Sequence, residues 1–143
     1  IPNGKEKHPV VYIALEDAQA FCRWAGVKLP SEQQWEKAAR GSDGRTYPWG
    51  EQVPDATLCN FGNHAVGTTP VGNYPQGASP YGVLEMAGNV WEWLAEWFDE
   101  SRIYAVLRGG SFNTGEANLR TSFRYRLSPD GRGGDRGFRV VSE

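Results

Sequence analysis

The chain has 143 residues, of which 22% are charged, and a formal net charge of −2 at pH 7. That length suits a single domain over residues 1–143, and the charge argues against broad electrostatic attraction to nucleic acid or to an anionic membrane. No apolar run approaches the roughly 20 residues of a membrane span. Residues 1–9 lack the basic region and apolar core of a secretion signal. The absence of an initiator methionine predicts a trimmed or partly ordered chain, so the sequence leaves the compartment open.

The first third of the chain predicts one strand and two helices. Val10–Ile13 is a short apolar run typical of a strand. Apolar residues at helical spacing then predict a helix that starts weakly after Ala14 and ends at Gly26. The second helix is better marked, because Ser31 and Gln34 have the spacing of a capping box and apolar residues follow on one face.

Residues 42–80 consist almost entirely of turn sequences, such as SDGRTYPWG and VGNYPQG. No helix or strand of any length fits there, so we predict a long ordered loop region. A loop of this length is uncommon unless it carries function or is ordered by something that it binds.

The last third of the chain predicts a small sheet. In the stretch GVLEMAGNVWEWLAEWFDE, the tryptophans at positions 91, 93 and 97 cannot share one helical face. We therefore place them in a turn and a strand, pointing into different parts of the core. Further strands are predicted over 105–112, with a break at two glycines, over 121–127 and over 137–142.

The cysteines and histidines do not have the spacing of common catalytic sites. Cys22 and Cys59 are expected to be buried free thiols, with a disulfide between them as the alternative. His8 and His64 have no neighbouring nucleophile motif, and zinc spacings such as CxxC and HExxH are absent. The GRGGDRG stretch lacks the lysine and the following helix of a phosphate-binding loop.

Two loops carry side-chain oxygens that suit calcium, a cation that prefers oxygen ligands. Asn89 and Glu92 lie beside a glycine in GNVWEW, and Asn60 and Asn63 lie in the long loop region. The alternative is that these side chains only hydrogen-bond nearby backbone.

The C-terminal third is rich in arginine and poor in lysine. A nucleic-acid surface would interleave lysines and exposed aromatic residues, whereas arginine suits fixed, planar hydrogen bonds to carboxylates and carbonyls. Most of these arginines are therefore expected to fix loops in place. They are Arg102, Arg108, Arg120, Arg124, Arg126, Arg132, Arg136 and Arg139.

Several motifs occur in order along the chain: HPVVYIALEDAQAFCRWAGVKLPSEQQWEKAARG, YPWG, GTTPVGNYPQG, YGVLEMAGNVWEW, LRGGSF and GFRVV. Together they closely resemble the formylglycine-generating enzyme family, also called sulfatase-modifying-factor domains, over nearly the whole chain. The resemblance implies an α+β, C-type-lectin-like fold, in which two helices pack on a small twisted antiparallel sheet with long ordered loops. Many members have a further N-terminal segment before the PVV strand, which this chain lacks or has lost.

The resemblance also implies what the chain does not do. The family's enzymes oxidise a sulfatase cysteine with copper and oxygen, and two cysteines shortly after the GGS-aromatic motif hold the copper. Here residues 113–119 read NTGEANL, and no cysteine follows Cys59. Cu(I) is soft and needs soft ligands, so neither copper nor oxidase activity is expected. Relatives that make sulfoxides in thiol-histidine biosynthesis use iron on a separate histidine-rich domain, which this chain does not have.

Calcium is the one cofactor that the resemblance supports. It implies a structural calcium ion at the GNVWEW-type loop, held by Asn89, the Val90 carbonyl and Glu92. Asn60 and Asn63 lie near the family's other calcium position, where this chain lacks an expected acidic residue.

With the oxidase chemistry removed, we expect a ligand-binding protein that is not an enzyme, with its binding region at about residues 112–136. Proteins diversified by retroelements use the same fold and vary between the GGS motif and the closing GFR strand. Their adenine-directed changes cannot create Lys, Glu, Gln, Met or Trp, and residues 112–139 contain none of these except one glutamate, Glu116. Ordinary loop composition is the alternative explanation. The candidate ligand-binding residues are Asn113, Thr114, Glu116, Asn118, Phe123, Tyr125, Leu127, Ser128, Gly131, Gly133 and Asp135.

Two arrangements of this region are open. Phe123 and Tyr125 would anchor a ligand in one, as aromatic residues do in antibody paratopes. In the other, Phe123, Tyr125 and Leu127 face the core and only polar residues are displayed. The expected partner is a protein or cell-surface molecule, without nucleic acid or membrane insertion, and the expected location is extracellular or surface-displayed. The runner-up is a formylglycine-generating-type copper oxidase, or a related enzyme, with a displaced active site.

Overall fold

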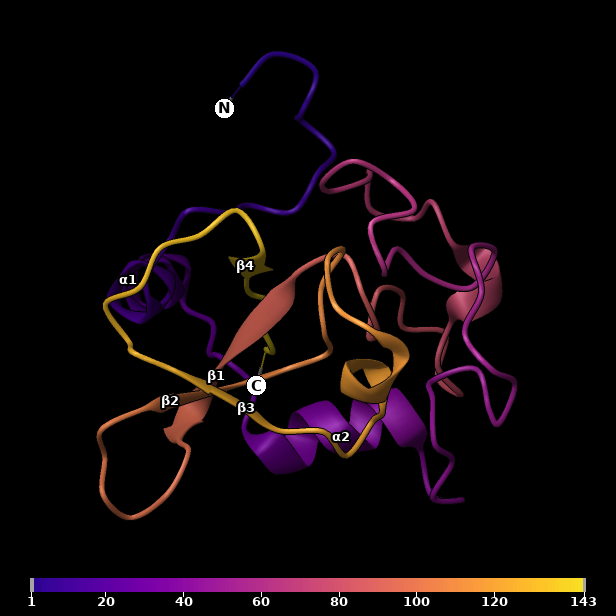
Figure 1. The fold of residues 1–143 in the computed structure, drawn as a ribbon. Helices are drawn as coiled ribbons and strands as arrows, with labels where there is room; N and C mark the ends of the chain where they lie inside the picture. The colour runs from indigo at the N-terminus through magenta and orange to yellow at the C-terminus, as the bar shows by residue number, and fades with distance from the viewer. Residues whose placement is uncertain (1, 143) are drawn as a thin grey trace.

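Two helices and a four-stranded sheet form the frame of residues 2–142, the part of the chain that this computed structural model describes. Helix α1 spans Leu15–Ala25 and helix α2 spans Glu32–Arg40. The long loops that follow α2 gather on one side of the frame, and the N-terminal segment passes over another (Figure 1). The α+β class that the sequence predicts is confirmed.

Both helices begin and end at residues that the sequence indicates. The Ala14 side chain cannot cap α1, but the Asp17 carboxylate accepts the Ala14 N–H at 2.8 Å. Gly26 ends this helix with a φ of 71°, a left-handed conformation that costs glycine little. At α2, Ser31 Oγ accepts the Gln34 N–H at 3.1 Å and Gln34 Oε1 accepts the Ser31 N–H at 2.9 Å. The predicted capping box is therefore confirmed.

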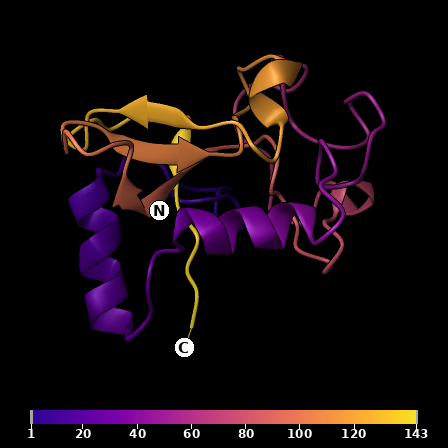
Figure 2. The ribbon, with the colours of Figure 1, turned by 90° about the horizontal axis from the view of Figure 1, so that it is seen from below.

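The sheet has the strand order β3-β2-β1-β4. Strand β1 spans Trp91–Trp97, β2 spans Ala105–Arg108, β3 spans Tyr125–Leu127 and β4 spans Arg136–Gly137. The β1–β2 and β2–β3 pairs are antiparallel, but β4 runs parallel to β1. The sheet is thus mixed, where the sequence suggested an antiparallel one. Figure 2 shows α2 along one side of the sheet and α1 running across the direction of α2.

The tryptophans of β1 do not point into different parts of the core as predicted. Trp91 and Trp93 belong to one buried cluster, which α1 completes with Ala18 and Cys22. The cause is the strand period of two, which places residues 91 and 93 on the same face. Leu94, on the opposite face, packs in a second cluster. Trp97, beyond an irregular register with β2, is 40% exposed.

The predicted strand at Val10–Ile13 does not form. Tyr12 has a φ of 60°, outside the extended region, and its N–H donates to the Gly133 carbonyl at 2.9 Å. The Val10 carbonyl packs directly against Gly137, where any Cβ would collide with it. Tertiary contacts with the C-terminal loop therefore replace the regular pairing that the apolar run suggested.

The C-terminal strands are shorter than predicted. Strand β2 stops at Arg108, because Gly109 and Gly110 have φ values of 104° and 73° and turn the chain. Of the strand expected over 137–142, only Gly137 joins the sheet, and Val141 forms an isolated antiparallel bridge with Lys28. Two single turns of 3-10 helix, η1 (Pro75–Gly77) and η2 (Glu116–Leu119), interrupt the long loops.

The cysteines behave as predicted. Cys22 and Cys59 are both buried and free. Within residues 2–142, no helix has the length and apolar character needed to cross a lipid bilayer.

Candidate functional site

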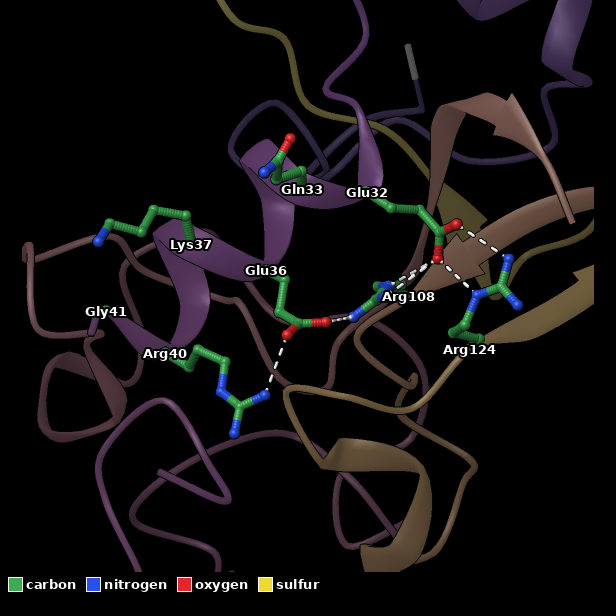
Figure 3. Close-up of a pocket in the computed structure, with 8 residues that line it drawn as sticks. All are labelled: Glu32, Gln33, Glu36, Lys37, Arg40, Gly41, Arg108 and Arg124. Atoms are coloured by element: carbon green, nitrogen blue, oxygen red, sulfur yellow. Dashed lines mark hydrogen bonds and ion pairs between the residues drawn. The ribbon is translucent and has the colours of Figure 1, made fainter. Parts of the chain in front are cut away.

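A pocket of about 410 Å³ lies between α2 and the sheet, and we call it the α2 pocket. Arg108, on β2, forms its centre: its guanidinium donates to Glu32 Oε1 at 3.0 Å, to Glu36 Oε1 at 2.6 Å and to the Thr121 carbonyl at 2.9 Å. Glu32 and Glu36 are one turn apart on α2 and so face the same side. Figure 3 shows both carboxylates directed at Arg108, with Gln33 and Lys37 pointing away from this network.

Two further arginines complete the network. Arg124 holds both oxygens of Glu32 at 2.7 and 2.9 Å, and Arg40 donates to Glu36 at 3.0 Å. Burial raises the pKa values of Glu32 and Glu36, but hydrogen bonds from these arginines outweigh burial and hold both pKa values below the usual range. The carboxylates of the α2 pocket are thus charged and paired with arginines, as expected of side chains that stabilise the fold.

A second buried ion pair lies at the β1 end of the GNVWEW loop. Glu92 accepts from Trp35 Nε1 at 2.8 Å and from Arg139 at 2.6 and 2.9 Å, so both of its oxygens have donors. Arg139 also donates to the carbonyls of Leu84 and Glu85. The prediction that arginines fix loops in place is confirmed at Arg108, Arg124 and Arg139.

The two loops predicted to hold calcium meet in the structure. Asn60 Nδ2 donates to the Gly67 carbonyl at 3.0 Å and lies 3.3 Å from Asn89 Oδ1. Asn89 Oδ1 also accepts the Thr69 N–H at 3.0 Å, and Asn89 Nδ2 donates to the Thr69 carbonyl. Asn60 Oδ1, in contrast, is buried and has no hydrogen-bond partner among residues 2–142. Of the other residues predicted to bind calcium, Asn63 is exposed and Val90 is buried.

Glu85 is a partly buried carboxylate that sequence reasoning missed. Its Oε2 atom has no hydrogen-bond partner within residues 2–142, and its φ of 61° is left-handed. Burial raises the pKa of Glu85, and the Glu92 carboxylate adds to that effect. Nothing in the stretch LEMAG distinguishes this glutamate from an exposed one, so only the fold reveals it.

A larger cleft, of about 590 Å³, lies between the N-terminal segment and three other parts of the chain, and we call it the N-terminal cleft. Apolar side chains and prolines form most of its wall, and four titratable side chains contribute to it. The other three parts are the 67–68 loop, the end of the GGSF motif and the loop before β4. Its lining residues are Pro2, Lys5, Glu6, His8, Pro9, Val10, Val11, Tyr12, Gly67, Thr68, Phe112 and Gly134.

The polar groups of the N-terminal cleft are less fully hydrogen-bonded than the carboxylates of the α2 pocket. The Tyr12 side chain is 67% exposed, and within residues 2–142 its hydroxyl has no hydrogen-bond partner. A non-glycine residue with a left-handed φ stores strain and is often found at functional sites. Gly134 makes room for the ring, because a Cβ there would lie 2.8 Å from Tyr12 Oη. His8 Nδ1 lies 2.8 Å from Thr68 Oγ1, and burial lowers the pKa of His8.

The structure brings together the two ends of the predicted binding region and separates its middle from them. Phe112 and Gly134 meet at the N-terminal cleft. Phe123 and Tyr125 instead pack on Trp91, with ring centroids 6.0 and 4.5 Å apart, and Leu127 packs on the same cluster. Of the two arrangements left open, the aromatic side chains therefore adopt the one that faces the core.

The polar candidates fall into two sets. Exposed positions are Asn113, Glu116 and Ser128. Partly buried positions are Thr114, Asn118, Gly131, Gly133 and Asp135. Thr114 and Asn113 hydrogen-bond Ser111, and Asp135 accepts from Arg136 at 3.0 Å. No functional role was predicted for His8, Tyr12 and Thr68, although all three lie in the family motifs HPVVYIALEDAQAFCRWAGVKLPSEQQWEKAARG and GTTPVGNYPQG.

Known proteins resemble this chain along nearly all of its length. The family described as sulfatase-modifying factor enzyme 1-like domain matches residues 2–143. The hercynine oxygenase of Mycolicibacterium smegmatis is 40% identical over 141 residues, which cover 81% of this chain and 33% of the oxygenase. The formylglycine-generating enzyme of Streptomyces coelicolor is 34% identical over 176 residues, covering 98% of this chain and 54% of that enzyme. Treponema denticola variable protein 1 has the same fold, with a TM-score of 0.83 at 22% identity over 97% of this chain and 73% of that one.

These relatives overturn the expectation that the protein is not an enzyme. Relatives at 40% and 34% identity carry the names of an oxygenase and of a formylglycine-generating enzyme, and the chain spans about a third and about half of their respective lengths. The missing cysteines exclude a copper site at the loop after the GGSF motif. They do not exclude catalysis of another kind.

Proposed function

This chain belongs to the sulfatase-modifying factor enzyme 1-like family, and from that premise we propose that it is the substrate-binding domain of an oxygenase- or oxidase-type enzyme. The proposed substrate site is the N-terminal cleft. One observation carries the proposal: this cleft combines a mostly apolar wall with polar side chains that have unused hydrogen-bonding atoms. Such a combination is typical of small-molecule sites, where a few polar groups fix the orientation of a ligand.

The loop after the GGSF motif does not fit copper. Thr114 and Asn113 offer hard oxygen atoms there, and both are bonded to Ser111. Burial raises the pKa of Cys59 to about 12, so this thiol stays protonated at neutral pH and is a poor metal ligand. Within residues 2–142, no three His, Cys, Asp or Glu side chains cluster as a metal site. We therefore assign substrate binding, and not oxygen activation, to this domain.

Calcium fits the Asn60 loop better than Glu92. A calcium ion at Glu92 would have to compete with Arg139 and Trp35 for both carboxylate oxygens. Asn60 Oδ1 is a buried oxygen to which no group of residues 2–142 donates, and a cation would satisfy it. Calcium bound there would tie the 60–69 loop to the GNVWEW loop. Calcium should then raise the melting temperature of the wild-type protein but not of Asn60→Ala; equal rises would contradict this site.

Substrate binding in the cleft is tested by blocking it. Val10 lines the cleft and is 50% exposed, so Val10→Trp should fill the space without disturbing the core. Val53→Trp, at a position that is 65% exposed and outside the cleft, is the matched control. The measurement is oxygen uptake by the full-length protein with hercynine, the compound named by the relatives. If both variants reduce oxygen uptake equally, or if neither reduces it, substrate binding in the N-terminal cleft is contradicted.

A second candidate is a ligand surface whose loop positions vary among related strains. The specific observation is the exposure of Asn113, Glu116 and Ser128 around the loops that reach the cleft. Sequencing the gene in sibling isolates tests it, since differences should concentrate between positions 113 and 135. Differences spread evenly along the chain would exclude it.

A further inference from the structure

The His8 imidazole, in the N-terminal cleft, has a hydrogen-bond partner within residues 2–142 at only one of its two nitrogens. His8 Nδ1 lies 2.8 Å from Thr68 Oγ1, and both residues line the cleft. Within residues 2–142, His8 Nε2 has no hydrogen-bond partner. The bond at Nδ1 fixes the orientation of the ring, and Nε2 remains as the atom that can bond a ligand.

The two segments that carry this pair are held together by backbone. The Val71 N–H donates to the Lys7 carbonyl at 2.8 Å, directly beside the His8–Thr68 contact. Pro9 follows His8 and keeps the His8 backbone out of the helical region. The imidazole is therefore positioned by both its main chain and its own hydrogen bond, as a binding residue needs to be.

The charges around His8 favour its neutral form. Burial is the larger cause that lowers the pKa of His8, and the nearby Lys5 ammonium lowers it further, against a smaller opposing effect of Glu6. Tyr12 is the remaining titratable side chain of the cleft wall. A neutral imidazole has one donor nitrogen and one acceptor nitrogen. If Nδ1–H donates to Thr68 Oγ1, Nε2 presents its lone pair to the cleft.

We propose that His8, oriented by Thr68, accepts a hydrogen bond from the ligand of the N-terminal cleft, and that this ligand joins an apolar or aromatic body to a weakly acidic O–H, N–H or S–H group. The inference rests on the proposed function of the cleft as the substrate site. Val10, Val11 and Phe112 provide the apolar wall for the body. The neutral imidazole provides the acceptor. Lys5 and Glu6 also line the cleft, but their opposite charges leave no net charge that would select an ion, and Tyr12 and Thr68 add none.

Two probes that differ only in the acidic proton test this inference: p-cresol, and 4-methylanisole, in which a methyl group replaces that proton. Binding is followed by shifts of the Gly67, Thr68, Phe112 and Gly134 amide signals in NMR titrations. We expect the wild-type protein to bind p-cresol about fivefold more tightly, the value of one net hydrogen bond. His8→Phe should abolish the preference, and Thr68→Val should reduce it to about twofold by freeing the ring.

His64→Gln is the matched control, because His64 bonds the Cys59 carbonyl and does not line the cleft. It should keep the full preference for p-cresol. Long-range ¹H–¹⁵N spectra of wild-type protein give a second readout that needs no variant. They should show protonated Nδ1 and unprotonated Nε2 at His8, with the preference for p-cresol lost as the pH falls through the pKa of His8.

The outcomes separate this inference from the function on which it rests. If both probes bind in the cleft with equal affinity, or if His8→Phe keeps the preference, the role of His8 is overturned while the cleft remains a binding site. A protonated Nε2 in the p-cresol complex overturns the acceptor role in the same way. If neither probe shifts the cleft amides, the N-terminal cleft itself is overturned as a ligand site.

Discussion

The α2 pocket and the N-terminal cleft both contain charged and polar side chains, and they differ in whether those groups are already bound. In the α2 pocket, Arg108, Arg124 and two glutamates satisfy one another. Among the buried side-chain nitrogen and oxygen atoms of this pocket, within residues 2–142, only Arg40 Nε lacks a partner. In the N-terminal cleft, Tyr12 is exposed and strained, and one His8 ring nitrogen has no partner among residues 2–142. A concentration of charge therefore marks stability in this protein, and unused hydrogen-bonding capacity marks the candidate site.

The largest expected effect comes from breaking the α2 network. Arg108→Ala leaves two partly buried carboxylates without their main partner, and loss of one member of a buried ion pair costs about 3–5 kcal/mol. Urea unfolding should show this loss as a lower midpoint at an unchanged slope. Arg132→Ala is the control, because Arg132 pairs with Asp17 at an exposed position. Similar losses in both variants would show that the α2 network is not the structural centre that the contacts indicate.

Acid should weaken the same network in wild-type protein. The pKa values of Glu32 and Glu36 are lowered on folding, so their charged forms stabilise the folded state. This contribution is complete above the unfolded-state value of about 4.3 and is lost as the pH falls through the lower folded pKa values. Unfolding free energy measured between about pH 6 and pH 2.5 should therefore fall more steeply in wild-type protein than in Arg108→Ala. Parallel curves would contradict the assignment.

An added methyl group in the N-terminal cleft should change binding more than stability. In Gly134→Ala, the new Cβ would lie 2.8 Å from Tyr12 Oη, so the exposed ring has to move. We expect a several-fold weaker affinity for p-cresol and a stability loss of about 1 kcal/mol. Gly115→Ala is the control, since its Cβ would meet no atom within 4 Å. An unchanged p-cresol affinity in Gly134→Ala would show that Tyr12 is not part of the cleft wall that binds p-cresol.

The smallest expected effect is a gain in stability. Tyr12→Asn places a residue that tolerates the left-handed conformation where tyrosine is strained, which should stabilise the fold by about 0.5–1 kcal/mol. The same change removes the phenol from the cleft and should weaken p-cresol binding. A stability gain with lost binding is the trade-off expected of a functional residue. A variant that loses stability would show that the Tyr12 ring is held by packing and not displayed for a ligand.

The sequence alone predicted the parts of this protein that depend on local chemistry. The capping box at Ser31 and the terminating Gly26 were correctly identified, because each acts within one turn of its helix. Ordered motifs also identified the family and the fold class. The sequence also shows directly that the cysteine pair of a copper oxidase is missing. The further inference that the protein is not an enzyme was wrong.

The tertiary structure decided the remainder, because it depends on contacts between distant residues. His8 and Thr68 are 60 positions apart, and Tyr12 meets Gly134 from the opposite end of the chain, so neither pair leaves a periodic signal. Glu85 and Glu92 look alike in sequence, yet within the described part of the chain Glu85 has an oxygen without a partner and Glu92 has donors at both oxygens. Which polar groups are satisfied is a property of the folded neighbourhood, and in this protein that property separates the structural pocket from the candidate site.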